Sequence, residues 1–455
     1  MKLVPSSLVA VAALALAQPL LADMPATPFK PDGQADPGYM VPDELSLSYA
    51  LSFALDNNFA IRQAKERIRQ QEGIVVEVRS QQIPNLTSTA GYSDTTQQLS
   101  TSTGDERTWS VNLTARQVVF AGGGVQAAVK AQRLALEAAT LQLQSVIDAA
   151  LLDVRTKFYN VLVTRERIKV QEQNVELLRR QLQDVKNRFE AGTVSNFEVL
   201  RAEVAVANAQ PALISARNAF RLAIDDLRQA LGFVTSDGAN VAKIPEFVGK
   251  LEFTPVSYEL PSALATAKER RPDLQRLKKL ELAAEETVTV RKSNYYPNLS
   301  AYAAYDWRKR PGYSDFAASR DGVTVGLQST WNIFDGVATR GRVVQAKSAL
   351  EQARLSFSEA ELSVSVEVRR ALSSLQEATE LAEASKKVVE QAEEAVRLAD
   401  ARYAAGTATQ LDVLQARTDL TTARLNQLQA YYSFNVASAS VRRAMGLPDE
   451  LVAGR

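Results

Sequence analysis

Residues 402–416 read RYAAGTATQLDVLQA, and residues 188–202 read RFEAGTVSNFEVLRA. The two stretches lie 214 residues apart and share the Arg, the Ala-Gly-Thr, an acidic residue and the Val-Leu in the same positions. Each lies at the end of a long run without Gly or Pro, from 125 to 191 and from 342 to 405. Because Gly readily adopts the left-handed conformation that ends a helix, the sequence predicts two very long helices that each stop at a Gly-Thr turn.

A second helix is predicted after each turn, over 195–231 and from 411 to Gly446. Pro211 falls inside the first of these helices and predicts a bend there. Before the turns, apolar residues recur at alternating spacings of three and four, as along a coiled-coil seam. The two seams are Val175, Leu178, Leu182, Val185 and Phe189, and Val389, Ala392, Val396, Ala399 and Tyr403.

Upstream of each long helix the sequence predicts a β-hairpin, at about 85–120 and about 298–334, because the apolar period changes to two. In the second strand of the first hairpin, one face carries Trp109, Val111, Leu113 and Ala115, and the opposite face carries Ser110, Asn112, Thr114 and Arg116. In the second strand of the second hairpin, one face carries Val323, Val325, Leu327, Trp331 and Ile333, and the opposite face carries Thr324, Gly326, Gln328, Thr330 and Asn332. A helix is predicted before each hairpin, over 43–72 with a break near Gly73, and over 273–296.

The order helix, hairpin, long helix, long helix therefore occurs twice, as a tandem duplication. The first repeat is predicted at 43–232 with its helical tip at about 188–200. The second is predicted at 256–447 with its tip at about 402–414. A linker over 233–255 joins them, and a tail follows over 448–455.

Composition excludes several kinds of function. The chain has no His and no Cys, which removes the commonest metal ligands, His general bases and thiolate nucleophiles. Its 53 basic and 52 acidic residues nearly cancel, so no global field favours nucleic acid. We expect no enzyme activity, catalytic residue, cofactor or metal.

The apolar run after Lys2 predicts a signal peptide over 1–22, followed by an extended lead-in over 23–42.

Strands with one apolar and one polar face are typical of a wall between outer-membrane lipid and water. Four strands cannot close a spanning sheet, so several copies would have to pool their strands. An aromatic girdle at the lipid interface is expected from Trp109, Tyr305, Trp307 and Trp331. The alternative is an ordinary soluble sheet packed against helices.

The duplicated plan, the Pro-Asn-Leu openings of the hairpins and the two Ala-Gly-Thr turns resemble the TolC-like outer-membrane efflux proteins over roughly 45–447. The resemblance implies a mainly α fold with a β-barrel portion: a homotrimer with a β-barrel in the outer membrane and an α-barrel in the periplasm. It implies a passive exit duct for drugs or small solutes, with a periplasmic adaptor and an inner-membrane pump as partners. A conduit for type I protein secretion is the alternative, and a periplasmic coiled-coil scaffold is a third possibility.

The resemblance also implies roles for the turn residues. Docking to the adaptor is expected at the tips, from Arg188, Ala191, Gly192, Thr193, Val194, Leu200, Arg402, Ala405, Gly406, Thr407, Ala408 and Leu414. Each glycine alone could equally be a plain helix end.

Gating is expected from Glu198, Tyr403, Asp412 and Gln415. Glu198 and Asp412 also fit capping boxes with Ser195 and Thr409, and in a trimer they would form carboxylate rings that favour cations. Ala408 and Gln415 stand where better-known members of the family have an arginine and a second aspartate. This difference predicts fewer ion pairs or hydrogen bonds that hold the mouth of the channel closed.

Overall fold

The computed structural model describes residues 43–96, 99, 107–233, 244–313 and 315–452. The predicted signal peptide and lead-in lie outside these residues. The same order of elements occurs twice along the described chain. The first series is α3 (Leu47–Asn57), α4 (Phe59–Arg79), β2 (Asn85–Asp94), β3 (Arg107–Ala121), α5 (Gly124–Glu190) and α6 (Asn196–Leu231). The second is α8 (Leu260–Arg270), α9 (Pro272–Lys292), β5 (Asn298–Lys309), β6 (Ser319–Thr330), α10 (Ala338–Ala404) and α11 (Gln410–Ala444).

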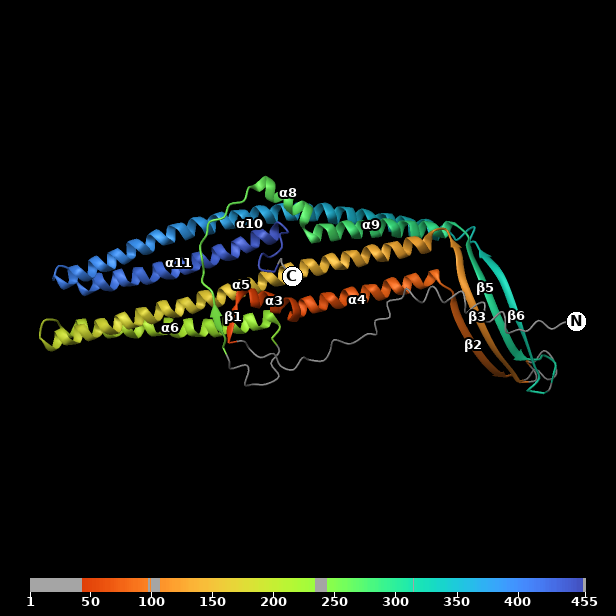
Figure 1. Cartoon of the computed structure of the whole chain (residues 1–455), viewed down its shortest axis with the longest axis horizontal. Coiled ribbons are helices and arrows are strands. Elements are labelled where there is room, and N and C mark those ends of the chain that lie inside the picture. Colours follow the sequence, from red (N-terminus) through yellow and green to blue (C-terminus); the bar gives the residue numbers. More distant parts are fainter. Residues whose placement is uncertain (1–42, 97–98, 100–106, 234–243, 314, 453–455) are drawn as a thin grey trace. The chain divides into compact units, whose positions relative to one another are not determined.

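The two 67-residue helices, α5 and α10, each run from the four-stranded sheet to one of the Gly-Thr turns (Figure 1). Each turns back into a shorter partner, so that α5 packs on α6 and α10 packs on α11. The two hairpins of helices also touch, because α11 contacts α5. Pro211 lies inside α6, and the helix continues on both sides of it.

Two buried apolar clusters lie where these long helices meet the short ones. The first joins α3, α5, α6 and β4 through Leu51, Phe158, Leu227 and Phe247. The second joins α8, α10 and α11 through Ala263, Val368, Phe434 and Val441. Each core therefore holds one helical hairpin to the short helix that precedes it in the same half.

The predicted first helix is wrong in two respects: residues 44–46 form a short strand, and the helix divides at Asn58 and not near Gly73. The Oδ1 atom of Asn58 accepts hydrogen bonds from the amides of Ala60 (2.9 Å) and Ile61 (3.3 Å), which caps α4. Its Nδ2 atom donates to the carbonyl of Ala230 (2.7 Å). Gly73 remains helical inside α4. A good cap with a tertiary partner therefore decides the break, whereas a single helical Gly costs only about 1 kcal/mol.

Two further features were not predicted. The linker contains β4 (Glu246–Val248), which pairs in parallel with β1 (Glu44–Ser46). Its register sets Leu45 beside Phe247, and both side chains are buried in the first core. Helix α8 was also missed. Strands of three residues carry no detectable period of their own, so only the long-range pairing reveals this sheet.

The four longer strands form one antiparallel sheet in the order β2-β3-β5-β6. Its register sorts the side chains by polarity. On one face, cross-strand rows bring together Leu86 with Ala115, Ala303 and Val325, and Tyr92 with Trp109. On the other face, one row contains Thr87, Thr114, Ala304 and Thr324, and another row contains Asn112 and Asp306. Because Val325 and Leu327 are each 71% exposed, the apolar face lies uncovered in the single chain.

The second predicted hairpin ends too late. Strand β6 stops at Thr330, so Trp331 and Ile333 do not continue its apolar face. The indole Nε1 of Trp331 donates to the carbonyl of Tyr295 (3.1 Å), in the turn that precedes β5. Apolar alternation extended the prediction past the point where strand pairing ends.

Candidate functional site

The two Gly-Thr turns end their helices with the same hydrogen bonds. The amide of Gly192 donates to the carbonyl of Phe189 (2.9 Å), and the amide of Thr193 donates to that of Arg188 (2.9 Å). The second turn repeats both bonds, from Gly406 to Tyr403 (3.1 Å) and from Thr407 to Arg402 (2.9 Å). This is the Schellman arrangement, in which the residue after the cap is left-handed. The φ angles of the two glycines, 73° and 75°, are in that region.

The threonine of each turn helps to end its helix, a role that was not predicted from the sequence. The Oγ1 atom of Thr193 donates to the same Arg188 carbonyl as its own amide (2.9 Å), and Thr407 does so to Arg402 (3.2 Å). Each hydroxyl therefore gives a second hydrogen bond to a carbonyl near the end of the helix. A Cβ atom at Gly192 or Gly406 would meet nothing within 4 Å. Glycine is therefore needed there for its backbone conformation, and the space beside it is open.

Most of the predicted docking residues lie exposed at the two turns. The exposed ones are Arg188, Ala191, Gly192, Thr193, Leu200, Arg402, Ala405, Gly406 and Thr407, while Val194 and Ala408 are half-buried. Leu414 lies elsewhere, because it packs against the small buried cluster of Val175, Leu178 and Ala209. Leu414 thus helps to hold the two helical hairpins together.

A contact between Arg188 and Tyr403 joins the first turn to the second. The guanidinium carbon of Arg188 lies 4.7 Å from the centroid of the Tyr403 ring, a cation–π distance. The Tyr403 hydroxyl is buried and has no hydrogen-bond partner within the described part of the chain. One predicted gate residue is therefore held by a predicted docking residue of the other hairpin.

Asp412 and Glu198 occupy equivalent positions but differ in their bonds. One carboxylate oxygen of Asp412 accepts from the Thr409 amide (2.7 Å) and hydroxyl (2.8 Å), which completes the predicted capping box. These two donors from Thr409 lower the pKa of Asp412. The capping box predicted for Ser195 and Glu198 is wrong, because the Ser195 side chain makes no capping hydrogen bond. There the amide of Glu198 donates to the backbone carbonyl of Ser195 (3.1 Å).

Gln415, the fourth predicted gate residue, is exposed and donates from Nε2 to Asp419 Oδ1 (2.9 Å), one turn along its own helix. An arginine that was not predicted makes the cross-helix contacts instead. Arg417 on α11 donates to Gln181 Oε1 on α5 (3.0 Å) and to Asp400 Oδ1 on α10 (3.0 Å).

Arg424 repeats this pattern seven residues later on α11. It donates to Glu393 on α10 (2.9 Å) and to Gln173 on α5 (3.3 Å). The spacing of seven, about two helical turns, was the available sequence signal, because it places both arginines on one face of α11. The two arginines therefore tie α11 to both neighbouring long helices behind the turns.

The predicted girdle residues lie at two levels of the sheet. Trp109 and Trp307 meet edge to face with ring centroids 4.9 Å apart, and Trp109 Nε1 donates to the Phe316 carbonyl (3.0 Å). The hydroxyl of Tyr305 donates to Asp321 (2.9 Å) near the same end. Trp331 lies at the other end, just after the β6 residue that pairs with Asn298. Along β5, these levels are separated by roughly 30 Å at about 3.4 Å per residue.

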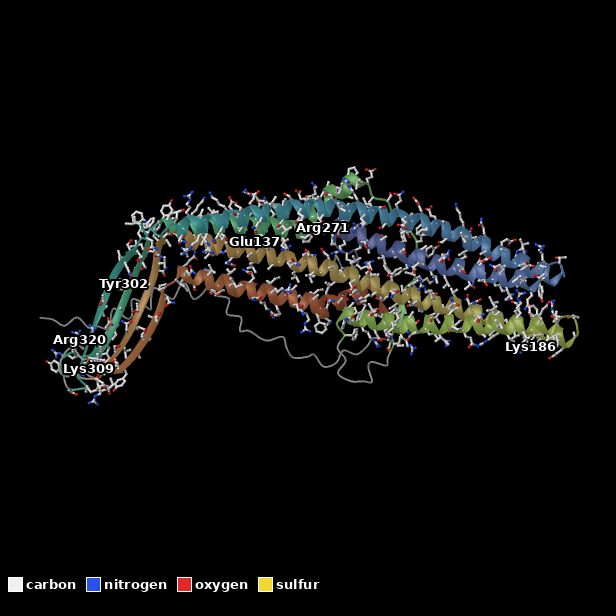
Figure 2. The ribbon with its side chains drawn as sticks, turned by 180° about the vertical axis from the view of Figure 1, so that it is seen from behind. Glu137, Lys186, Arg271, Tyr302, Lys309 and Arg320 are labelled. Carbon is white, nitrogen blue, oxygen red and sulfur yellow. The ribbon has the colours of Figure 1, made fainter. Side chains whose placement is uncertain are left out.

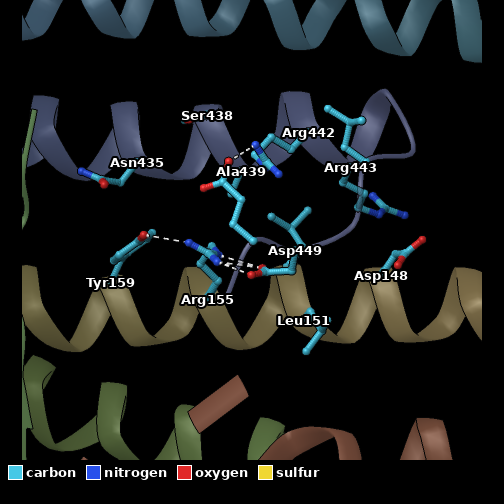
Figure 3. A pocket seen from close by; sticks show the side chains of 13 residues that line it. Asp148, Leu151, Arg155, Tyr159, Asn435, Ser438, Ala439, Arg442, Arg443 and Asp449 are labelled. Atoms are coloured by element: carbon cyan, nitrogen blue, oxygen red, sulfur yellow. Dashed lines mark hydrogen bonds and ion pairs between the residues drawn. The ribbon is translucent and has the colours of Figure 1, made fainter. Parts of the chain in front are cut away.

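A separate small cavity of about 120 Å³ lies between α5, α11 and the segment 448–452 (Figure 3). Arg155 on α5 makes a bidentate ion pair with Asp449, with 2.7 Å between Nη2 and Oδ1, and both side chains are at most 16% exposed. Nearby, burial raises the pKa of Asp148. The Asp449 carboxylate that lines the cavity is already paired with Arg155, so we interpret this ion pair as a structural clasp between α5 and the segment after α11.

Two features are absent from the described residues. None of the described helices contains an apolar stretch that would span a bilayer. No group of three or more acidic residues in the described ranges is arranged to hold a metal ion, in a chain without His or Cys.

Comparison with known proteins identifies the family. The family model described as outer membrane efflux protein matches residues 50–233 and 263–447 of this sequence. These residues include both turns and both pairs of strands. The chain belongs to this family. Since it does, a transport role is supported in place of an enzymatic one, and the two repeated turns are features of a transport protein.

Individual relatives match over most of their length. Protein CyaE of Bordetella pertussis is 27% identical over 409 residues, covering 88% of this chain and 85% of that protein. The cobalt-zinc-cadmium resistance protein CzcC of Cupriavidus metallidurans is 27% identical over 404 residues, covering 88% and 90%. The crystal structure of the Campylobacter jejuni CmeC outer membrane channel has the same fold, with a TM-score of 0.77 at 15% identity over 88% of this chain and 85% of that one.

Proposed function

We propose that three copies of this chain form a duct through the outer membrane and across the periplasm, through which an energised pump expels small solutes. The observation that carries the proposal is the four-stranded sheet, with an uncovered apolar face, a polar face and outer strands β2 and β6 that pair on one side only. In lipid, the backbone groups of an unpaired strand edge have no hydrogen-bond partners, and the free-energy cost is too high. The sheet must therefore close by pairing with the strands of other copies.

Three copies satisfy this requirement. They supply twelve strands, an even number within the range of bacterial outer-membrane barrels, which starts at eight. The two aromatic levels also fit. A separation of roughly 30 Å along strands tilted by about 40° spans close to the ~25 Å apolar band of such barrels. Trp109, Trp307 and Trp331 would then mark the two lipid–water interfaces.

The helical turns are the proposed periplasmic mouth and the docking site for an adaptor. Both turns lie at the end of the helices away from the sheet (Figure 1), and most of their residues are exposed. The open space beside Gly192 and Gly406 allows close approach of another backbone. A small-solute cargo is in keeping with the name of the relative CzcC, a metal-ion resistance protein.

Purification from outer membranes tests this assembly. We expect a detergent-solubilised trimer that forms ion-conducting pores in planar bilayers and is crosslinked to an adaptor through photoreactive residues at Val194 or Ala408. A probe at Arg133 on α5, far from both turns, is the matched control. The pump recovered with the adaptor decides the cargo, and a protein exporter would show that the duct serves secretion. A chain that stays monomeric in buffer without detergent would instead be a periplasmic scaffold.

The acidic residues of the mouth have a separate test. We propose that Glu198 and Asp412 form carboxylate rings in the trimer, so that Glu198→Ala/Asp412→Ala raises conductance and weakens cation selectivity. Single-channel currents under a salt gradient measure both quantities. Asp225→Ala/Asp226→Ala, on α6 beyond the mouth, is the control. Unchanged selectivity in a correctly assembled trimer would exclude the rings.

A further inference from the structure

Two arginines face each other at the end of the sheet that lies away from the helices. Arg308 on β5 and Arg320 on β6 are direct cross-strand partners, and both side chains are exposed. Figure 2 shows Arg320 at this end of the sheet, close to the turn between the two strands. Neither arginine forms an ion pair with any residue in the described ranges. Like charges in this position destabilise a sheet.

Both arginines belong to the polar face. Their neighbours along the strands, Trp307 and Asp321, pair with each other on the apolar face. The nearest carboxylate on the polar face is that of Asp306, two residues before Arg308. It is half-buried and accepts a hydrogen bond from Asn112 Nδ2 (2.8 Å). The acid closest to the pair is thus engaged with a neutral amide.

The polar face as a whole carries an excess of positive charge. Its paired positions hold three arginines, Arg116, Arg308 and Arg320, but only one acid, Asp306. Arg116 donates to Gln328 Oε1 (2.8 Å), which is also neutral. The remaining positions are mainly Thr, Ser, Asn, Gln and Gly. No side chain on this face therefore neutralises Arg308 and Arg320.

We propose that Arg308 and Arg320 form an anion-binding site at the outer end of the duct, for solutes that carry several phosphate or carboxylate groups. The inference rests on the proposed function, because it takes the polar face as the wall of the lumen. Guanidinium groups bind such oxyanions through two parallel hydrogen bonds. Two of them side by side favour an oligoanion over a singly charged ion. In a trimer, six arginines would encircle the exit, opposite in charge to the acidic residues of the mouth.

Block of the channel by tripolyphosphate tests the site. The probe is added to the compartment that faces the turns of the β-hairpins, and the half-blocking concentration is measured at low and high salt. We expect Arg308→Gln/Arg320→Gln to raise that concentration about tenfold or more, because charge-assisted hydrogen bonds are lost. Arg308→Lys/Arg320→Lys keeps the charges and should retain most of the block.

Arg107→Gln is the matched control, because Arg107 lies at the same end of the sheet but pairs with Asp94 on the other face. It should leave the block unchanged. Calorimetric titration of the detergent-solubilised protein with tripolyphosphate gives an independent measure that requires no current. Equal block and equal binding in the wild type and in Arg308→Gln/Arg320→Gln would overturn the anion site alone. If the wild type forms no pores, the proposed function itself fails.

Discussion

At the scale of the single residue, the clearest backbone strain in this chain is at Val337. In the described part of the structure it is the one non-glycine residue with positive φ, at 69°, and it precedes α10. The equivalent residue in the first half, Gly123, has φ 78°. A β-branched side chain in this region is strained by about 1–2 kcal/mol. The repeat thus keeps the backbone turn while tolerating an unfavourable residue in the second copy.

Val337→Gly should therefore stabilise the protein. After subtracting the extra chain entropy of glycine, we expect the free energy of unfolding to rise by roughly 0.5–1 kcal/mol. Gly123→Val should lower it by about 1–2 kcal/mol, since a Cβ there meets no other atom but is strained. Denaturant unfolding of the two variants measures this. A loss of stability in Val337→Gly would contradict the strain.

The turn glycines allow a second prediction at this scale. Gly406→Ala should destabilise its turn by about 1 kcal/mol, because Ala disfavours a φ of 75°. Gly73→Ala is the control, since Gly73 is helical within α4 and has open space around it. That change should stabilise the protein by about 0.5–1 kcal/mol. Equal effects of the two changes would mean that backbone conformation does not explain Gly406.

At the level of elements, the two return helices begin differently although their sequences correspond. Thr409 caps α11 with its side chain, whereas Ser195 makes no such bond to α6. Thr409→Ala should therefore cost about 1 kcal/mol, and Ser195→Ala clearly less. Amide hydrogen exchange in the first turn of each helix measures the difference. Equal protection changes in the two variants would contradict it.

The cap on α11 should also depend on pH. The pKa of Asp412 is lowered in the folded chain by the Thr409 amide and hydroxyl. Its contribution to stability is therefore fully present above the unfolded pKa of about 3.9, and it is lost as the pH falls through the lower folded value. Below about pH 4 the amides in the first turn of α11 should lose protection relative to their intrinsic exchange rates, and Asp412→Asn should remove this pH dependence.

For the whole molecule, the decisive feature is the seam between the two halves, where α11 lies against α5. Arg417 and Arg424 cross it near the turns, and the ion pair of Arg155 with Asp449 closes it farther along α5. Asp449→Ala would leave Arg155 largely buried without its carboxylate. We expect a loss of about 3 kcal/mol.

Arg155→Met/Asp449→Ala should recover much of that loss, because no unpaired charge remains. Asp153→Ala is the control, since its ion pair with Lys157 is more exposed and lies within α5. Thermal unfolding in detergent measures all three variants. If the single Asp449 change is as mild as the control, the segment after α11 does not clasp the halves.

Much of the fold could be predicted because its signals are local. The long runs without Gly or Pro, the left-handed glycines and the alternation of the strands each act within a few neighbouring residues. The break at Asn58, the short β1–β4 sheet and the end of β6 could not be predicted, since each depends on a partner far along the chain. In the turns, the glycine positions were correct, but the capping box of Ser195 with Glu198 and the place of Leu414 were not.

The sequence by itself determined two helical hairpins, their Gly-Thr turns and two amphipathic pairs of strands, because backbone conformation and side-chain period are properties of contiguous residues. Only the tertiary structure decided that Arg188 lies on Tyr403, that Arg417 bridges three helices, and that Arg308 faces Arg320. Those contacts depend on strand register and on the rotation of packed helices, which are set by the fit of whole surfaces. A shift of one residue in register would turn every strand side chain to the opposite face.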